Sequence, residues 1–316
     1  MAKVLISRRF PDSIVARAKT LFDADIHNET TPISQEARAE ALSTYDGILA
    51  TLGDTYAADL FEQPNLRTKI ISNFGVGYNH IDAAAAAKAG VQVTNTPGVL
   101  TDATADIAMT LMMMVARRAS EGERMVRANQ WEGWHPTQLI GQDITGRTLG
   151  IIGFGRIGQA MACKAHFGFG MRIVFQNRSP KTVDFPAEQL SSIEAVCAEA
   201  DVVAIHAPGA PENKHLFNAA HFAAMKPSGI FINTARGDVV DEDALIETLE
   251  QGKIFGAGLD VYEYEPIVPD RLKALENVVL LPHLGSASLP VREAMGNMAL
   301  DNLEAFFAGK PVPNPV

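Results

Sequence analysis

Three ionisable side chains in the C-terminal third of the chain each follow a short apolar run. They are Arg236, Glu265 and His283, and a turn-forming glycine or proline stands beside each of them. Side chains placed in this way at strand ends can assemble into a catalytic site. A cation, a carboxylate and an imidazole are the groups needed to anchor an acid substrate and to move a proton at its carbonyl.

Each member of this trio has a predicted role. His283 is the best proton donor among the eight histidines, because it alone follows a proline at the end of an apolar run and precedes a run of small residues. Glu265 would bond the second ring nitrogen of His283 and stabilise the imidazolium. The fork of Arg236 would hold a substrate carboxylate and carbonyl oxygen together. The plainer alternatives are an acidic loop for Glu265 and a surface salt bridge for Arg236.

A glycine-rich turn upstream predicts the cofactor. Gly153, Gly155 and Gly158 form a Gly-x-Gly-x-x-Gly pattern between an apolar strand and an apolar helix. Gly153 would allow a tight turn, Gly155 would let a pyrophosphate approach, and Gly158 would let helix and strand pack closely. The alternative is a glycine turn that binds nothing. A bound nicotinamide cofactor would explain why the site needs a proton donor, since hydride arriving at a carbonyl leaves an oxyanion.

The residues after the next predicted strand favour NADPH as the cofactor. An acidic side chain about 20 residues beyond the glycine turn normally bonds the ribose hydroxyls of NAD. Here the segment reads Asn177-Arg178-Ser179-Pro180-Lys181 and holds no carboxylate. Donors and positive charge suit a ribose 2′-phosphate. We therefore expect NADPH, with NADH as a weaker substitute; the alternative is a solvated polar turn with an incidental arginine.

Short apolar runs alternate with helical segments along the whole chain, which predicts an α/β fold with two doubly wound parallel sheets. The first series has strands at 3–6, 47–50, 69–73 and 91–95. After a long helix from Thr101 to about Glu123, a second series has six strands at 148–153, 172–176, 202–206, 229–233, 256–261 and 278–281. We expect the C-terminal helix to return to the first sheet. Residues 1–98 and 289–316 would then form a substrate domain, and residues 99–288 an inserted dinucleotide-binding domain.

Composition limits the classes of function. The 316 residues carry a formal net charge of -10, which argues against binding nucleic acid or an anionic membrane. The N-terminus enters a strand directly, and the longest apolar helix is too short to span a bilayer, so we expect a cytoplasmic protein. The two cysteines, Cys163 and Cys197, are expected to be buried structural thiols, and no metal site is predicted.

Four of these motifs resemble those of the D-isomer-specific 2-hydroxyacid dehydrogenases. They are Gly153 to Gly158, Thr234-Ala235-Arg236-Gly237, the run from Leu259-Asp260 to Glu265-Pro266, and Pro282-His283-Leu284-Gly285. The resemblance runs the full length of the chain. It implies a Rossmann coenzyme domain inserted in a flavodoxin-like substrate domain, with the catalytic arginine, glutamate and histidine at Arg236, Glu265 and His283.

The resemblance also implies contacts with substrate and cofactor. The loop after the fourth apolar run would receive the substrate carboxylate on the amides of Val76 and Gly77. Asp260 is in addition a candidate for tuning the histidine and glutamate pair. The implied cofactor contacts are Thr101, Gly153, Gly155, Arg156, Ile157, Gly158, Asn177, Arg178, Ser179, His206, Ala207, Pro208, Thr234, Ala235, Asp260 and Gly285.

Within the family, the chain looks most like the glyoxylate/hydroxypyruvate reductases. In those enzymes a tryptophan from the segment corresponding to 131–136 reaches the neighbouring subunit, which maps to Trp134 and implies a homodimer. The helix from Thr101 would supply much of the dimer contact. Two other functions remain open: reduction of bulkier 2-keto acids such as phenylpyruvate, and a non-catalytic scaffold that senses dinucleotides.

Overall fold

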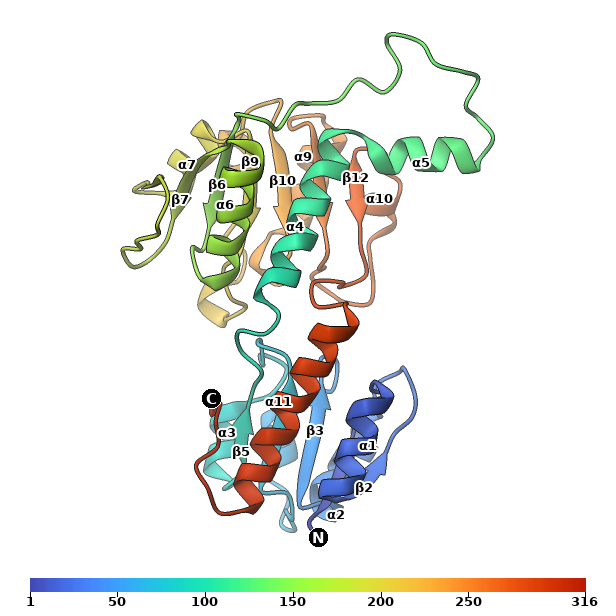
Figure 1. Ribbon diagram of the computed structural model, residues 1–316, viewed down its shortest axis with the longest axis vertical. Helices are drawn as coiled ribbons and strands as arrows, with labels where there is room; N and C mark the ends of the chain where they lie inside the picture. Colours follow the sequence, from blue (N-terminus) through green and yellow to red (C-terminus); the bar gives the residue numbers. More distant parts are fainter. The chain divides into compact units, whose positions relative to one another are not determined.

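The computed structural model describes all residues from Met1 to Val316, which divide into two compact units (Figure 1). The first unit comprises Met1–Leu100 and Ala287–Val316, and the second comprises Thr101–Ser286. The predicted boundaries at 98 and 288 lie within two residues of this division. Each unit has its own parallel sheet, so the predicted α/β class with two doubly wound domains is confirmed.

The first unit is built on a five-stranded parallel sheet with the order β2-β1-β3-β4-β5. This is the flavodoxin-like order. Helices α1 and α11 cover one face, and α2, η1 and α3 cover the other (Figure 1). The strands are β1 (Lys3–Ile6), β2 (Asp23–Ile26), β3 (Gly47–Thr51), β4 (Ile70–Phe74) and β5 (Gln92–Thr94); the helices are α1 (Asp12–Leu21), α2 (Gln35–Thr44), η1 (Ala58–Phe61), α3 (Ala83–Lys88) and α11 (Leu289–Phe307).

Helix α11 returns from the far end of the chain to the first sheet, as expected. Met295, Leu300 and Leu303 are buried in the same core as Ile14 of α1 and Ile70 of β4. Gly296 lies so close to Ile14 that a Cβ atom there would come within 2.7 Å of its side chain. Burial of this apolar stripe holds α11 against the first sheet, so α11 is the closing helix that the sheet would otherwise lack.

The second unit is built on a seven-stranded parallel sheet with the order β12-β11-β10-β9-β6-β7-β8. The order reverses at β6, as in dinucleotide-binding sheets. Helices α4 and α6 share a core on one face, and α7, α8 and α9 share a core on the other. The strands are β6 (Thr148–Ile152), β7 (Arg172–Gln176), β8 (Ala187–Gln189), β9 (Val202–Ile205), β10 (Ile230–Asn233), β11 (Gly256–Leu259) and β12 (Val278–Leu280); the helices are α4 (Thr101–Ala116), α5 (Ala119–Arg127), α6 (Arg156–Phe169), α7 (Ile193–Glu199), η2 (Pro211–Asn213), α8 (Ala219–Ala224), η3 (Gly237–Val239), α9 (Glu242–Glu250) and α10 (Asp270–Lys273).

Two strands were not predicted, and both are polar edge strands. The first sheet gains β2 and the second gains β8, so the prediction of six strands in the second series was wrong. In β2 half-buried residues alternate with exposed ones and none is fully buried, and in β8 two of the three residues are exposed. Apolar runs identify strands that are buried on both faces. Edge strands of this kind have no such run.

The predicted long helix from Thr101 to Glu123 is also wrong, because it breaks near Arg118. Arg118 has a left-handed backbone with φ of 50°, and α5 starts beyond it with no buried residue. The carbonyl of Ala116 at the end of α4 accepts a hydrogen bond from the amide of Gln142, 2.7 Å away. The chain therefore leaves α4, runs out through α5 and a long loop, and returns over the end of α4 (Figure 1).

The cysteines behave differently from each other. Cys197 on α7 is buried, as expected, whereas Cys163 on α6 is exposed, which corrects the expectation that both are buried. No helix in the structure has the length and apolar character needed to cross a membrane.

Candidate active site

Arg236 stands on a turn that is fixed by the last residue of β10. The side-chain amide of Asn233 donates to the carbonyl of Arg236 at 2.9 Å, and its oxygen accepts from the amide of Ala235 at 3.0 Å. Gly237 then passes so close to the backbone of Tyr262 that a Cβ atom would lie 1.9 Å from its carbonyl carbon. The sequence Thr-Ala-Arg-Gly is thus folded tightly against the turn that carries Glu265.

The guanidinium of Arg236 keeps a donor free. Nη1 donates to the carbonyl of Ala235 at 2.7 Å, whereas Nε is buried without a hydrogen-bond partner. Burial lowers the pKa of Arg236, and the nearby carboxylate of Glu265 opposes this. Because arginine is not deprotonated in proteins, the group remains a cation. A buried donor without a partner is costly, so a carboxylate or carbonyl oxygen that reached Nε would be bound well.

Glu265 and His283 form a direct pair. Nδ1 of His283 lies 2.8 Å from Oε2 of Glu265, and the amide of Tyr262 donates to Oε1 at 3.1 Å. Burial alone would raise the pKa of Glu265, but the hydrogen bond and charge of His283 lower it below its ordinary value. Because Glu265 occupies Nδ1, Nε2 is the ring nitrogen of His283 that is left for another partner. The predicted bond between these two residues is therefore present.

Asp260 holds the loop that carries His283. Its carboxylate accepts from the amides of Leu284 at 2.6 Å and Gly285 at 2.7 Å, and its carbonyl accepts from the amide of His283 at 3.0 Å. His283 itself has a left-handed φ of 56°, which is uncommon for a residue other than glycine. Burial raises the pKa of Asp260 despite these bonds. Its contacts therefore position His283, while the cofactor contact implied for Asp260 and Gly285 remains a prediction.

The glycine turn after β6 has the geometry that a dinucleotide requires. Gly153 has φ of 90°, and a Cβ atom there would lie 2.6 Å from the amide nitrogen of Ala207. At Gly158 a Cβ atom would lie 2.6 Å from the carbonyl of Gly153, whereas nothing lies within 4 Å of one at Gly155. Helix α6 begins at Arg156 without a side-chain cap. Its first amides, including that of Ile157, are thus available to a pyrophosphate.

Asn177 ties the end of β7 to this glycine turn. Its side-chain oxygen accepts from the amide of Phe154 at 3.0 Å, and its amide group donates to the carbonyl of Ser179 at 2.8 Å. Arg178, next to it, is exposed, with Nη1 3.7 Å from a carboxylate oxygen of Glu212. Sequence reasoning missed Glu212, because it lies 34 residues away on the loop after β9.

The other predicted cofactor residues lie at strand ends or helix starts. His206, Ala207 and Pro208 follow β9, Thr234 and Ala235 follow β10, and Thr101 is the first residue of α4. His206 is half-buried, with Nε2 of its ring 3.2 Å from the sulfur of Met161. Burial lowers its pKa from 6.5 to about 4, so the ring is neutral near pH 7.

The lowered pKa of His206 predicts an acid-sensitive contribution to stability. Below pH ~6.5 the histidine of the unfolded chain binds a proton, whereas the ring in the folded protein stays neutral down to about pH 4. The free energy of unfolding therefore falls as the pH falls through this window. We expect the wild type to lose about 2 kcal/mol more between pH 7 and pH 5 than His206→Gln. Urea denaturation at both pH values measures this, with His135→Gln at an exposed ring as the control. Equal losses in wild type and His206→Gln would refute the prediction.

In the first unit, the loop after β4 presents the two amides predicted to bind a carboxylate. The carbonyls of Gly75 and Gly77 accept from the side chain of Asn73 at 3.1 and 3.0 Å, and the carbonyl of Val76 accepts from Asn95 at 2.9 Å. These bonds fix the conformation of the loop, and the binding of a substrate carboxylate by the amides of Val76 and Gly77 remains a prediction.

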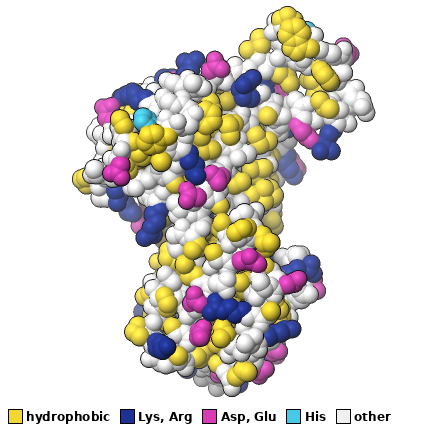
Figure 2. Space-filling model, viewed as in Figure 1, with side chains coloured by type: hydrophobic (Ala, Val, Ile, Leu, Met, Phe, Trp, Pro, Cys, Tyr) yellow, Lys and Arg dark blue, Asp and Glu magenta, His cyan; other side chains and the backbone are white.

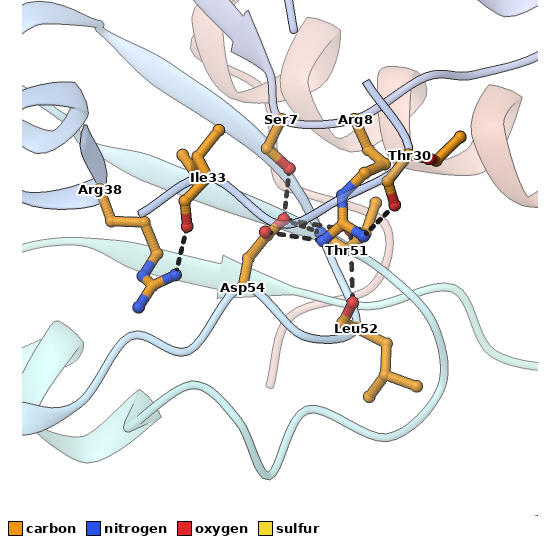
Figure 3. Close-up of polar contacts among 8 residues, drawn as sticks. All are labelled: Ser7, Arg8, Thr30, Ile33, Arg38, Thr51, Leu52 and Asp54. Carbon is orange, nitrogen blue, oxygen red and sulfur yellow. Dashed lines mark hydrogen bonds and ion pairs between the residues drawn. The ribbon is translucent and has the colours of Figure 1, made fainter. Parts of the chain in front are cut away.

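The neighbouring loop after β3 is held by a buried carboxylate that sequence reasoning missed. Asp54 is fully buried and accepts from Ser7, from the amide and hydroxyl of Thr51, and from Arg8 at 2.9 Å (Figure 3). Arg8 also donates to the carbonyl of Thr30. This network joins the ends of β1 and β3 and fixes the backbone on which Leu52 stands.

Trp134 lies on the long loop beyond α5, and 79% of its surface is exposed. Other apolar side chains of this arm, Val126, Trp131 and Ile140, are exposed as well. Figure 2 shows hydrophobic side chains gathered on the projecting arm at the upper right. The substrate contact predicted for Trp134 therefore remains a prediction.

Comparison with known proteins gives one consistent result. A family model described as "D-isomer specific 2-hydroxyacid dehydrogenase, NAD binding domain" matches residues 109–285. The chain is 40% identical over 320 residues to the glyoxylate reductase of Thermococcus onnurineus, covering 99% of this chain and 95% of that protein.

Solved structures agree with this result. A putative D-isomer specific 2-hydroxyacid dehydrogenase from Polaromonas superposes with a TM-score of 0.92 and 38% identity, covering 100% of this chain and 99% of that one. An NADPH-dependent glyoxylate/hydroxypyruvate reductase from Sinorhizobium meliloti, solved with NADP and malonate, gives 0.86 and 32%, covering 100% and 96%.

Proposed function

The chain belongs to the D-isomer specific 2-hydroxyacid dehydrogenase family, and from this premise we propose that it reduces a small 2-keto acid, glyoxylate or hydroxypyruvate, to the D-2-hydroxy acid with NADPH. The observation that carries the proposal is the pair formed by His283 and Glu265 at 2.8 Å, beside the buried and unpartnered Nε of Arg236. This arrangement provides a proton donor and an anion anchor, which are the two functions that hydride transfer to a keto acid demands.

A bound nicotinamide cofactor supplies the hydride that adds to the carbonyl carbon. Arg236 binds the carboxylate and polarises the carbonyl oxygen of the substrate, so that negative charge can build up on that oxygen. His283 donates its Nε2 proton to the oxygen as the carbonyl π pair moves there, which leaves the ring neutral. Glu265 stabilises the imidazolium before the transfer, because its carboxylate stays on Nδ1.

Substrate size decides between the proposed activity and its alternatives. We expect kcat/KM to be highest for glyoxylate and hydroxypyruvate and to fall with phenylpyruvate. Steady-state rates of NADPH oxidation with these acids measure the order. A preference for phenylpyruvate would establish the bulkier-acid alternative, and no oxidation with any of them would establish the non-catalytic scaffold.

The preference for NADPH is the finer part of the proposal, and it is supported by the side chains after β7. Arg178 is exposed, and the residues from Asn177 to Lys181 include no carboxylate. We expect Arg178→Gln to raise the KM for NADPH about tenfold, the loss of one charge-assisted phosphate contact, with little change for NADH. Arg172→Gln, at the opposite end of β7, is the matched control. A wild-type preference for NADH would refute the assignment.

We further propose that the protein is a homodimer. The support is the arm of α5 and its loop, which exposes Val126, Trp131 and Trp134 and buries no residue of α5. In the proposed dimer this arm, together with α4, contacts the second copy, and Trp134 reaches that copy's active site. Sedimentation velocity should give about twice the chain mass of 34.0 kDa. A species of single chain mass at working concentration would contradict this.

A further inference from the structure

An acidic side chain faces Arg178 from the other side of the glycine turn. Oε1 of Glu212 lies 3.7 Å from Nη1 of Arg178, and both side chains are largely exposed. Glu212 belongs to η2, on the loop after β9, whereas Arg178 follows β7. Since the residues from Asn177 to Lys181 include no carboxylate, the acid that pairs with this arginine comes from a different loop.

Backbone anchors fix the loops at both ends of this pair. On one side, the bonds of Asn177 to Phe154 and Ser179 hold the turn that carries Arg178. On the other side, Asn213 is 6% exposed and its side chain donates to the carbonyl of Pro208 at 2.8 Å, while its amide donates to the carbonyl of Ala210. Pro211 further restricts the first position of η2. The backbone positions from which the two charged side chains extend are thus fixed, although the side chains themselves are exposed.

The strand order places this pair at the cofactor's position. Strands β7 and β9 flank β6 on its two sides. Arg178 and Glu212 therefore reach toward each other across the carboxyl end of β6, where the glycine turn lies and where dinucleotides bind in such sheets. A ribose phosphate that bonds Arg178 would approach the carboxylate of Glu212.

We propose that Glu212 is a specificity-determining residue that competes with the 2′-phosphate for Arg178 and so limits the preference for NADPH. The inference rests on the proposed role of Arg178. A 2′-phosphate carries between one and two negative charges near pH 7, so it is repelled by Glu212 and must displace it from Arg178. A free 2′-hydroxyl is not repelled, and it can donate to a carboxylate.

The test compares dissociation constants measured by calorimetry, so that binding is read without turnover. For Glu212→Gln we expect the Kd for NADPH to fall about two- to fivefold, the range of an exposed charge pair, while the Kd for NADH stays the same or rises. In Glu212→Gln, the Kd for adenosine 2′,5′-bisphosphate should fall as that for NADPH does, and the Kd for AMP should behave as that for NADH does. Glu188→Gln, an exposed carboxylate on β8 paired with Arg172, is the control and should leave all four values unchanged.

The double variant Arg178→Gln/Glu212→Gln shows whether Glu212 acts through Arg178. With Arg178 absent, the gain from Glu212→Gln should shrink, because the competition has been removed. Suppose that Arg178→Gln weakens NADPH binding. If Glu212→Gln then leaves the Kd for NADPH unchanged, or lowers the Kd values for NADPH and NADH equally, the role of Glu212 is refuted while the cofactor assignment stands. If Arg178→Gln changes the Kd for neither NADPH nor NADH, the cofactor assignment itself is refuted.

Discussion

Replacing His283 by glutamine should lower kcat for keto-acid reduction about a thousandfold, since it removes the general acid of the reaction. Glutamine has an amide that can donate a hydrogen bond but cannot release a proton. The carbonyl oxygen would then receive its proton from water, without the orientation that Glu265 imposes on the ring at 2.8 Å. Both kcat and kcat/KM should fall, because the interaction lost is one that develops in the transition state.

Cofactor binding separates this loss from misfolding. Calorimetric titration of His283→Gln with NADPH should give nearly the wild-type Kd, because the glycine turn after β6 is untouched. The control is His166→Gln, which removes an imidazole from the last turn of α6, at the opposite end of that helix from the glycine turn, and should keep full kcat. Turnover of His283→Gln at the wild-type rate would remove this residue from its role as proton donor.

The parts of the site that were predictable from sequence are those carried by one local pattern. Arg236 and His283 each follow a short buried strand, and the structure places Glu265 and His283 within hydrogen-bonding distance. The glycine turn is predictable for the same reason, because its three glycines are needed where a Cβ atom would collide or where a ligand must approach. Strand ends in a parallel sheet meet at one edge, so local patterns there predict a shared site.

Interactions between distant segments were not predictable in this way. Asp54 bonds Ser7 and Arg8 across 46 or more residues, and Glu212 approaches Arg178 across the one strand, β6, that separates β9 from β7. Neither pairing leaves a periodic signal, since each depends on which strands are neighbours. The break near Arg118 is similar, because nothing in the local run of good helix formers indicates that the chain leaves α4 there.

Truncating Arg236 should produce the other large effect. Arg236→Gln should lower kcat/KM about 10³-fold, as expected for the loss of about 4 kcal/mol when one partner of a buried, hydrogen-bonded charge pair is removed. The KM for the keto acid should rise, because the anchor for its carboxylate is gone. Part of the loss should appear in kcat, because the same fork also polarises the carbonyl oxygen.

The conservative variant Arg236→Lys tests the fork rather than the charge. Lysine keeps one positive charge but cannot present two donors in a plane, so most of the loss should remain. Inhibition by oxalate, a dicarboxylate close to glyoxylate in size, should weaken in parallel with the rise in KM, while the Kd for NADPH stays near the wild-type value. Arg271→Gln, which breaks an exposed pair with Glu250 in the same unit, is the matched control. Full recovery of kcat/KM in Arg236→Lys would show that a point charge suffices, and the assignment of the carbonyl oxygen to the fork of Arg236 would then be wrong.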